Sequence, residues 1–304
     1  MARFVQMLPK SGIYADQNFM IAPKSGFNLV YLRDGKDFDI THDNRIDVHE
    51  VTFGDVETIA KAYMSTRAAG SEGADRLLQL RTAMYGGVGA TASGKLLQVR
   101  ANGAGIPILA VRRGTTELRL DVAIMKRKEF SVAFKFVKHT TSGKAVMPLT
   151  TYAPTDAQGW IDQLNWIYGA QVNVHFKLVG ADWISLKTTA SQPMTFEEFA
   201  RTLVPQKHIG AAMTCFLVGR YKGSATGSDA AGSYSSMHRV CVLDDGPTYG
   251  VFDDSDYDSF IGVMAHEFGH FAGLAHHNRG RFMMSTGIET LDFDKQLVSD
   301  INPW

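Results

Sequence analysis

The sequence predicts an α+β fold in two parts: a β-sandwich-like N-terminal part, and a C-terminal part in which strands alternate with helices. Two observations support this division. Up to about residue 140, short runs alternate apolar and polar residues with period two, as half-buried strands do. Beyond that point, apolar runs of strand length alternate with stretches of helical periodicity. We therefore expect two domains, 1–140 and 141–304, which suits a chain of 304 residues.

Short strands dominate the predicted N-terminal domain. They are expected at 28–32, 38–40, 45–51, 96–100, 106–112, 116–122 and 130–137. Gly, Asn and Asp residues, the usual turn formers, separate many of these runs. Apolar residues recur at helical spacing in the stretch of about 55–85, which predicts a helical insertion between strands. Many short strands with such turns favour a β-sandwich.

The strand spacing between Gly26 and Val122 resembles that of a bacterial immunoglobulin-like domain. Residues 110–120 read Ala-Val-Arg-Arg-Gly-Thr-Thr-Glu-Leu-Arg-Leu, and a Gly-Thr-Thr-x-Leu run commonly forms a late strand in that family. The resemblance implies an immunoglobulin-like domain that could bind a partner. The residues equally allow this domain to inhibit or to space the C-terminal one.

The C-terminal part is predicted to form a small mixed sheet beneath two long helices. Its strands are expected at 146–152, 172–179, 212–218 and 238–243. The helices are expected at 156–169, where Asp156 is the N-cap, and at 260–274. A capping box at 195–198 should open a further helix, which Pro205 ends.

Charge and hydropathy give no sign of nucleic acid or of a membrane. Lys and Arg together number 31, as do Asp and Glu, so electrostatic attraction to nucleic acid or to an anionic membrane is not expected. The sequence contains no run of about eighteen apolar residues, so no membrane-spanning helix is predicted. The first ten residues lack the apolar core of a signal peptide. Three explanations stay open: the chain stays where it is made, it is exported by a route without a signal peptide, or this sequence lacks its leader.

The chain contains two cysteines, Cys215 and Cys241. Both lie in apolar runs that we interpret as strands of one sheet. Two cysteines do not form a disulfide framework. Buried free thiols and a single disulfide are both compatible with this pattern.

Residues 266–276 read His-Glu-Phe-Gly-His-Phe-Ala-Gly-Leu-Ala-His. Positions i and i+4 of a helix face the same way, so His266 and His270 can chelate one metal ion. Glu267 could reach a water bound to that metal. His276 would be a third ligand, and a catalytic zinc ion has three protein ligands and one open position. The pattern therefore predicts a Zn²⁺ site with a neighbouring acid.

Gly273 explains how His276 could reach the same metal. A glycine adopts a left-handed conformation at low cost, which would end the helix and turn the chain back. Two alternatives are a helix whose histidines face solvent and a metal site without catalysis. Glu267 argues against the second, because a structural zinc site is closed by a fourth ligand.

At these residues the chain resembles the metzincin zinc peptidases, whose motif His-Glu-x-x-His-x-x-Gly-x-x-His is followed by a methionine-bearing turn. Residues 281–287 read Arg-Phe-Met-Met-Ser-Thr-Gly, and Met284, eight residues beyond His276, is our candidate for that methionine, with Met283 as the alternative. The resemblance covers roughly residues 141–304. It implies a zinc endopeptidase with a protein or peptide substrate, Glu267 as general base, and Met284 as an apolar floor below the metal.

His277 departs from the known metzincin subfamilies, which carry other residues after the third ligand. It could be a polar group that supports the site or a spare ligand. Six aspartates precede the motif, at positions 244, 245, 253, 254, 256 and 258. Alternating carboxylates can bind calcium, but they also suit a solvated loop before a helix N-terminus.

Two functions compete on the sequence. The first is a zinc endopeptidase, for which the missing signal peptide favours a toxin or effector with its own secretion route. The second is a binding or adhesion protein whose metal-binding domain has little activity. In the first case, we expect the substrate to add to an edge strand within 232–237 by backbone hydrogen bonds.

Overall fold

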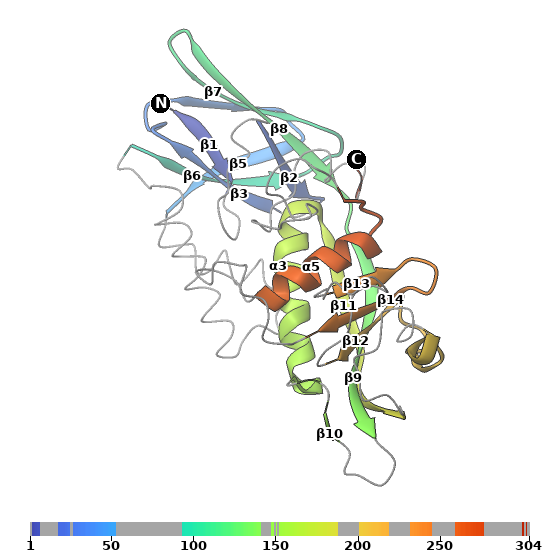
Figure 1. Cartoon of the computed structure of the whole chain (residues 1–304). Coiled ribbons are helices and arrows are strands. Elements are labelled where there is room, and N and C mark those ends of the chain that lie inside the picture. Colours follow the sequence, from blue (N-terminus) through green and yellow to red (C-terminus); the bar gives the residue numbers. More distant parts are fainter. Residues whose placement is uncertain are drawn as a thin grey trace. The chain divides into compact units, whose positions relative to one another are not determined.

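The computed structural model describes residues 2–6, 18–24, 27–52, 93–140, 147–148, 150, 152–187, 201–218, 232–244, 259–276, 300 and 302 (Figure 1). Within these residues, strands form three β-sheets and two long helices accompany them, so the α+β class is confirmed. None of the described helices is long and apolar enough to cross a membrane.

The chain divides into two compact units. One comprises Met1–Lys128, Asn165–His175 and Thr290–Trp304, and the other comprises Glu129–Leu164 and Phe176–Glu289. The strand expected at 130–137 therefore lies in the second unit. The division into two domains, 1–140 and 141–304, stays a prediction.

The first unit contains two four-stranded sheets. One has the order β1 (Arg3–Gln6), β3 (Phe27–Arg33), β6 (Lys95–Ala101), β5 (Ile46–Val51), and all its pairs are antiparallel. The other has the order β2 (Phe19–Pro23), β8 (Thr116–Met125), β7 (Ile108–Arg113), β4 (Asp39–His42), with β2 parallel to β8.

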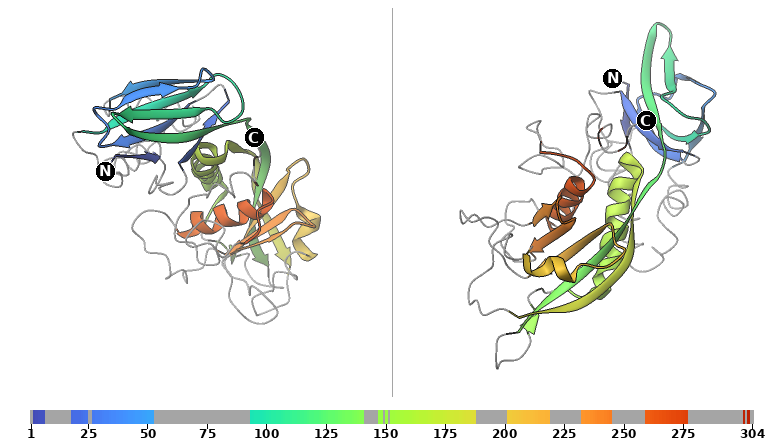
Figure 2. Two further views of the ribbon diagram at one scale, coloured as in Figure 1. Left: turned by 90° about the horizontal axis from the view of Figure 1, so that it is seen from above. Right: turned by 90° about the vertical axis from the view of Figure 1, so that its right-hand side faces the viewer.

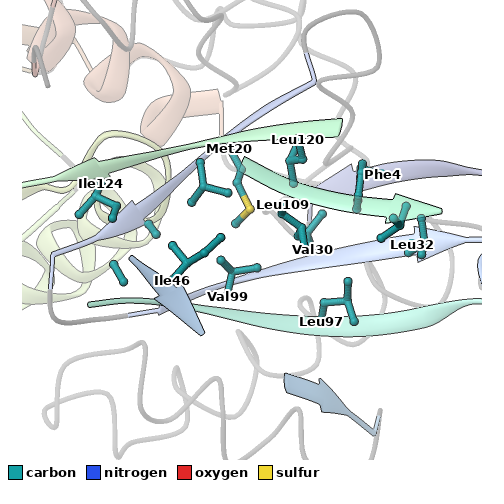
Figure 3. Close-up of a cluster of buried hydrophobic side chains, with 14 of the residues drawn as sticks. Phe4, Met20, Val30, Leu32, Ile46, Leu97, Val99, Leu109, Leu120 and Ile124 are labelled. Atoms are coloured by element: carbon teal, nitrogen blue, oxygen red, sulfur yellow. The ribbon is translucent and has the colours of Figure 1, made fainter. Parts of the chain in front are cut away.

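Alternate residues of both sheets meet in one buried cluster, shown in Figure 3. Val30 and Val99 from one sheet lie in this cluster with Leu109 and Leu120 from the other. Because side chains along a strand point to opposite faces in turn, the period-two pattern selects this inward set. The two sheets thus form the sandwich that the sequence predicts. The immunoglobulin-like resemblance stays a prediction, and the insertion at about 55–85 lies outside the described residues.

The second unit is built on a mixed sheet. Its strands are β9 (Lys128–Thr140), β10 (Met147–Pro148), β11 (Val174–Lys187), β12 (Met213–Val218), β13 (Gly232–Ser235) and β14 (Val240–Asp244). They follow the order β10-β9-β12-β14-β13, and β11 also pairs with β9. β9, β12 and β14 are parallel, whereas β13 runs antiparallel at the edge. This edge strand lies within the predicted range 232–237.

All six residues of β12 are buried, which explains why they are apolar apart from Thr214. On one face of the sheet, the ring centroid of Phe134 in β9 lies 5.5 Å from that of Trp160 and 6.4 Å from that of Phe268. Trp160 lies in the first half of α3 (Ala157–Val172) and Phe268 lies in α5 (Ser259–Phe271). Figure 2 shows these two helices in yellow-green and in orange-red. On the other face, a cluster that includes Phe216 and Leu203 is buried.

The strand predicted at 146–152 is shorter than expected. Among its described residues only Met147–Pro148 pairs, and Pro148 has no N–H to donate to a ladder. A 3₁₀ turn, Pro154–Asp156, then leads into α3. The N-cap is Ala153 rather than the predicted Asp156, which lies three residues further on, at the end of this turn. The Asp156 carboxylate accepts a hydrogen bond from the N–H of Ala153 at 2.8 Å and so supports the helix start from inside the turn.

α3 ends at Val172 rather than at Gly169. The next residue, Asn173, takes a left-handed conformation with φ of 50°, and its N–H donates to the carbonyl of Gly169 at 3.2 Å. Asn is one of the few residues that tolerate this conformation at a helix end. Its side-chain amide donates to the carbonyl of Met125 at 2.7 Å.

Cys215 and Cys241 are register partners in β12 and β14, so they lie in one sheet as expected. Both are fully buried and both are free thiols. The free-thiol interpretation is therefore confirmed over the disulfide.

Candidate metal centre

α5 presents two of the predicted ligands, and the chain beyond it presents the third. Nε2 of His276 lies 2.9 Å from Nε2 of His266 and 3.0 Å from Nε2 of His270. His266 is buried, His270 is half-buried and His276 is exposed. The potential ligand atoms of the three residues all lie within 4.8 Å of one another.

This cluster fits a zinc ion. Tetrahedral zinc with Zn–N bonds of about 2.0–2.1 Å places its nitrogen ligands about 3.3 Å apart, close to the distances found here. In the described part of the chain, no fourth His, Cys, Asp or Glu joins the group. Three nitrogens with an open position are the donor set of a catalytic rather than a structural zinc site.

The end of α5 brings His276 back to the helix. Gly273 has a φ of 104°, and its N–H donates to the carbonyl of His270 at 3.0 Å. The N–H of Leu274 donates to the carbonyl of Gly269, also at 3.0 Å. These two bonds and the left-handed glycine form a Schellman motif. The helix consequently ends at Phe271 rather than at Leu274, and the turn predicted at Gly273 is present.

The same turn orients the imidazole of His270. Its Nδ1 lies 2.8 Å from the carbonyl oxygen of Leu274. Because a carbonyl oxygen can only accept, Nδ1 must carry the proton, which leaves the lone pair on Nε2. Burial lowers the pKa of His270 and so favours the neutral form that a metal requires.

Glu267 is 6% exposed, and burial raises the pKa of its carboxyl to about 8. Its side chain lies against the edge strand, because a Cβ atom placed on Gly232 would be 2.9 Å from its Cγ. The side chain of Glu267 therefore extends from α5, the helix of the histidines, toward β13. A positive ion at the histidines would shift the carboxyl back toward its ionised form.

Cys241 contributes to this region as a core group rather than as a ligand. Burial first, and then its neighbours Cys215 and Glu267, raise the pKa of its thiol well above the usual value. A metal ligand must be a thiolate, and these surroundings favour the protonated thiol.

Several predicted site residues lie outside the described residues: His277, Met283, Met284 and five of the six aspartates. Their roles stay predictions. Asp244 is the last residue of β14 and is the register partner of Val218. A calcium site has no support in the described part of the chain.

Sequence reasoning missed two contributors to the site, the carbonyl of Leu274 and Gly232. A main-chain acceptor leaves no signal in a sequence. A glycine inside a predicted strand is a signal, since it often marks the close approach of another group.

The motif, the three converging histidines and the glycine at the helix end have the arrangement of the metzincin zinc peptidases. No protein-family model and no curated protein matches the chain. Solved structures similar to it include an archaemetzincin from Methanopyrus kandleri, with 13% identity, 58% of this chain and 93% of that chain covered, and a TM-score of 0.39.

Two more structures are similar. The archaemetzincin from Archaeoglobus fulgidus, complexed with malonate, shares 16% identity over 56% of this chain and 99% of its own, with a TM-score of 0.35. A zinc-dependent peptidase from Methanocorpusculum labreanum shares 12% identity over 57% and 100%, with a TM-score of 0.33. At these values the similarity carries no conclusion about activity, so the chemistry is inferred from the side chains of the site.

Proposed function

We propose that the protein is a zinc-dependent endopeptidase that hydrolyses peptide bonds by means of an activated water. The convergence of three Nε2 atoms, 2.9 and 3.0 Å from His276 to the other two, is the observation that carries this proposal. His266, His270 and His276 would hold the ion. A bound zinc ion would acidify a water molecule and polarise the scissile carbonyl.

Glu267 is the proposed general base. It would take a proton from the attacking water and later deliver that proton to the leaving amine. Its burial supports this role, since an acid whose pKa lies near neutrality can both accept and release a proton. Its position beside His266 on α5 places it one residue from a proposed ligand.

The peptide substrate is proposed to dock along β13. In the described residues this strand pairs only with β14, so its other side offers backbone groups to an added strand. The contact between Gly232 and Glu267 supports this placement, because it puts the proposed base beside the docking strand. An exported toxin or effector role, and a partner for the N-terminal sandwich, stay predictions from the sequence.

Cleavage of a complex peptide library by the zinc-loaded full chain tests the proposal. We expect Glu267→Gln to retain zinc but to lose about 10²–10⁴ in rate, the usual contribution of a general base. His276→Ala should lose both zinc and cleavage. His49→Ala, which removes an exposed histidine of β5 in the first unit, is the matched control and should cleave as the wild type does.

Absence of cleavage by folded, zinc-loaded wild type would contradict the endopeptidase. It would favour the alternative of a binding or adhesion protein whose metal-binding domain is inactive. Cleavage that Glu267→Gln leaves unchanged would instead contradict the role of Glu267 alone.

A further inference from the structure

Gly232, the first residue of β13, is crowded by the helix that carries the proposed site. A Cβ atom at this position would lie 2.8 Å from Cγ1 of Val263, 2.9 Å from Cγ of Glu267 and 2.9 Å from Cδ2 of Leu243. Atoms at such separations overlap, so any side chain here would force one of these groups to move.

The backbone of Gly232 does not itself require a glycine. Among the described glycines, positive φ angles occur at Gly105, Gly114, Gly210 and Gly273, but not at Gly232. The absence of a side chain therefore serves the close approach of the strand to α5, and not a special turn.

Of the three crowded groups, Glu267 is the one with a chemical role in the proposed reaction. It is 6% exposed, so its stem cannot move aside into solvent. Val263 and Glu267 both belong to α5, whereas Leu243 is the register partner of Gly232 on β14. The stem of Glu267 is thus confined between the helix and the start of the edge strand.

We propose that Gly232 is a positioning residue that sets the place of the Glu267 carboxyl relative to the docked peptide. This inference rests on the proposed function. The strand that would hold the peptide is the strand that confines the base, so one contact fixes the distance between them. A misplacement of about 1 Å in such a group can cost about 100-fold in rate.

Gly232→Ala in the zinc-loaded full chain tests this role. We expect kcat to fall by about tenfold or more, because the new methyl group displaces the base. KM for the best library peptide should change by less than about twofold, since the backbone groups that bind the peptide are retained. Zinc affinity, measured by competition with a chromogenic chelator, should stay as in the wild type because the substitution touches none of the three histidines.

Gly180→Ala is the matched control in the same unit. A Cβ atom there would lie 2.7 Å from Cε1 of His208, so the crowding is similar, but Glu267 is not among its neighbours. This variant should retain wild-type kcat. If Gly232→Ala does not fold, Gly232→Ala with Val263→Ala is compared with Val263→Ala alone. The double variant removes the overlap with Val263 but keeps the overlap with Glu267, so it should still show the low kcat.

Wild-type kcat in Gly232→Ala, or in the double variant relative to Val263→Ala, would overturn the inference. A fall in kcat with an equal fall in zinc affinity would also overturn it, because it would indicate general damage to the site. An active wild type with an unaffected Gly232→Ala contradicts only this role, whereas an inactive wild type contradicts the proposed function as well.

Discussion

At the scale of single residues, the Cys241 thiol shows how the core beneath α5 controls reactivity. The thiol is fully buried beside Cys215, and its pKa is raised mainly by burial. Because both thiols are buried away from solvent, we expect no alkylation of either cysteine in the native protein at pH 8. Both should react once the chain is denatured. Mass spectrometry after timed iodoacetamide labelling checks this, and rapid native labelling would contradict the buried assignment.

Asp43 gives a pH-dependent prediction in the first unit. Its carboxylate accepts hydrogen bonds from the backbone N–H, Nε and Nη2 of Arg45 at 3.0, 2.9 and 2.6 Å, which lower its pKa from 3.8 to about 2. A carboxyl whose pKa is lower in the folded than in the unfolded state stabilises the fold at pH values above its unfolded-state pKa. This contribution is lost as the pH falls from about 4 to about 2.

We therefore expect the wild type to have a higher Tm than Asp43→Asn at pH 7. The difference should shrink progressively below pH 4. Thermal unfolding at a series of pH values measures it, and a difference that is independent of pH would show that the ion pair with Arg45 is not its source.

At the scale of elements, the helix end at Gly273 can be tested by a matched pair of substitutions. Gly273 and Gly210 have φ angles of 104° and 88°, and a Cβ atom on either would meet no atom within 4 Å. Alanine at either position should destabilise the fold by about 1–2 kcal/mol, because L-residues are strained in this region.

Only Gly273→Ala should also weaken zinc binding, by about 10–100-fold, since its turn places His276 and orients His270. Thermal unfolding and chelator competition measure the two effects separately. Equal zinc affinity in the two variants would mean that the Schellman turn does not position the ligands.

Glycines also explain why the predicted ends of one helix and one strand differ from the observed ends. The sequence pattern predicts a helix end at Gly169 and a strand end just before Gly180, yet α3 continues to Val172 and β11 to Lys187. In both places an imidazole packs against the glycine: His175 at Gly169 and His208 at Gly180. Sequence patterns treat glycine as a breaker of regular structure, whereas here it permits close approach within an element.

The periodic elements could be predicted because their burial is repetitive. The alternation along β7 and over residues 118–122 of β8 follows directly from strand geometry, and the spacing of His266 and His270 follows from helix geometry. The short strands β1 and β2 were missed because four or five residues carry too little pattern. The pairing of strands could not be predicted either, because the residues of β12 that pair with β9 lie about 80 residues further along the chain.

At the scale of the whole molecule, the metal should contribute to stability. A ligand that binds only the folded state stabilises it by about 2.7 kcal/mol when its free concentration is roughly 100 times Kd. We expect a chelator to lower the Tm of the zinc-loaded wild type. His276→Ala should have the same Tm with and without zinc. A chelator-insensitive wild type in thermal unfolding would contradict a zinc site in the folded chain.

The candidate metal centre draws all three of its nitrogens from one run of eleven residues, 266–276, and closes that run on itself through the turn at Gly273. The residues that supply its ligands therefore lie within one short stretch of the sequence rather than spread along the chain. Distant proteins with this centre should therefore be sought by a short pattern and a helix ending rather than by overall sequence similarity.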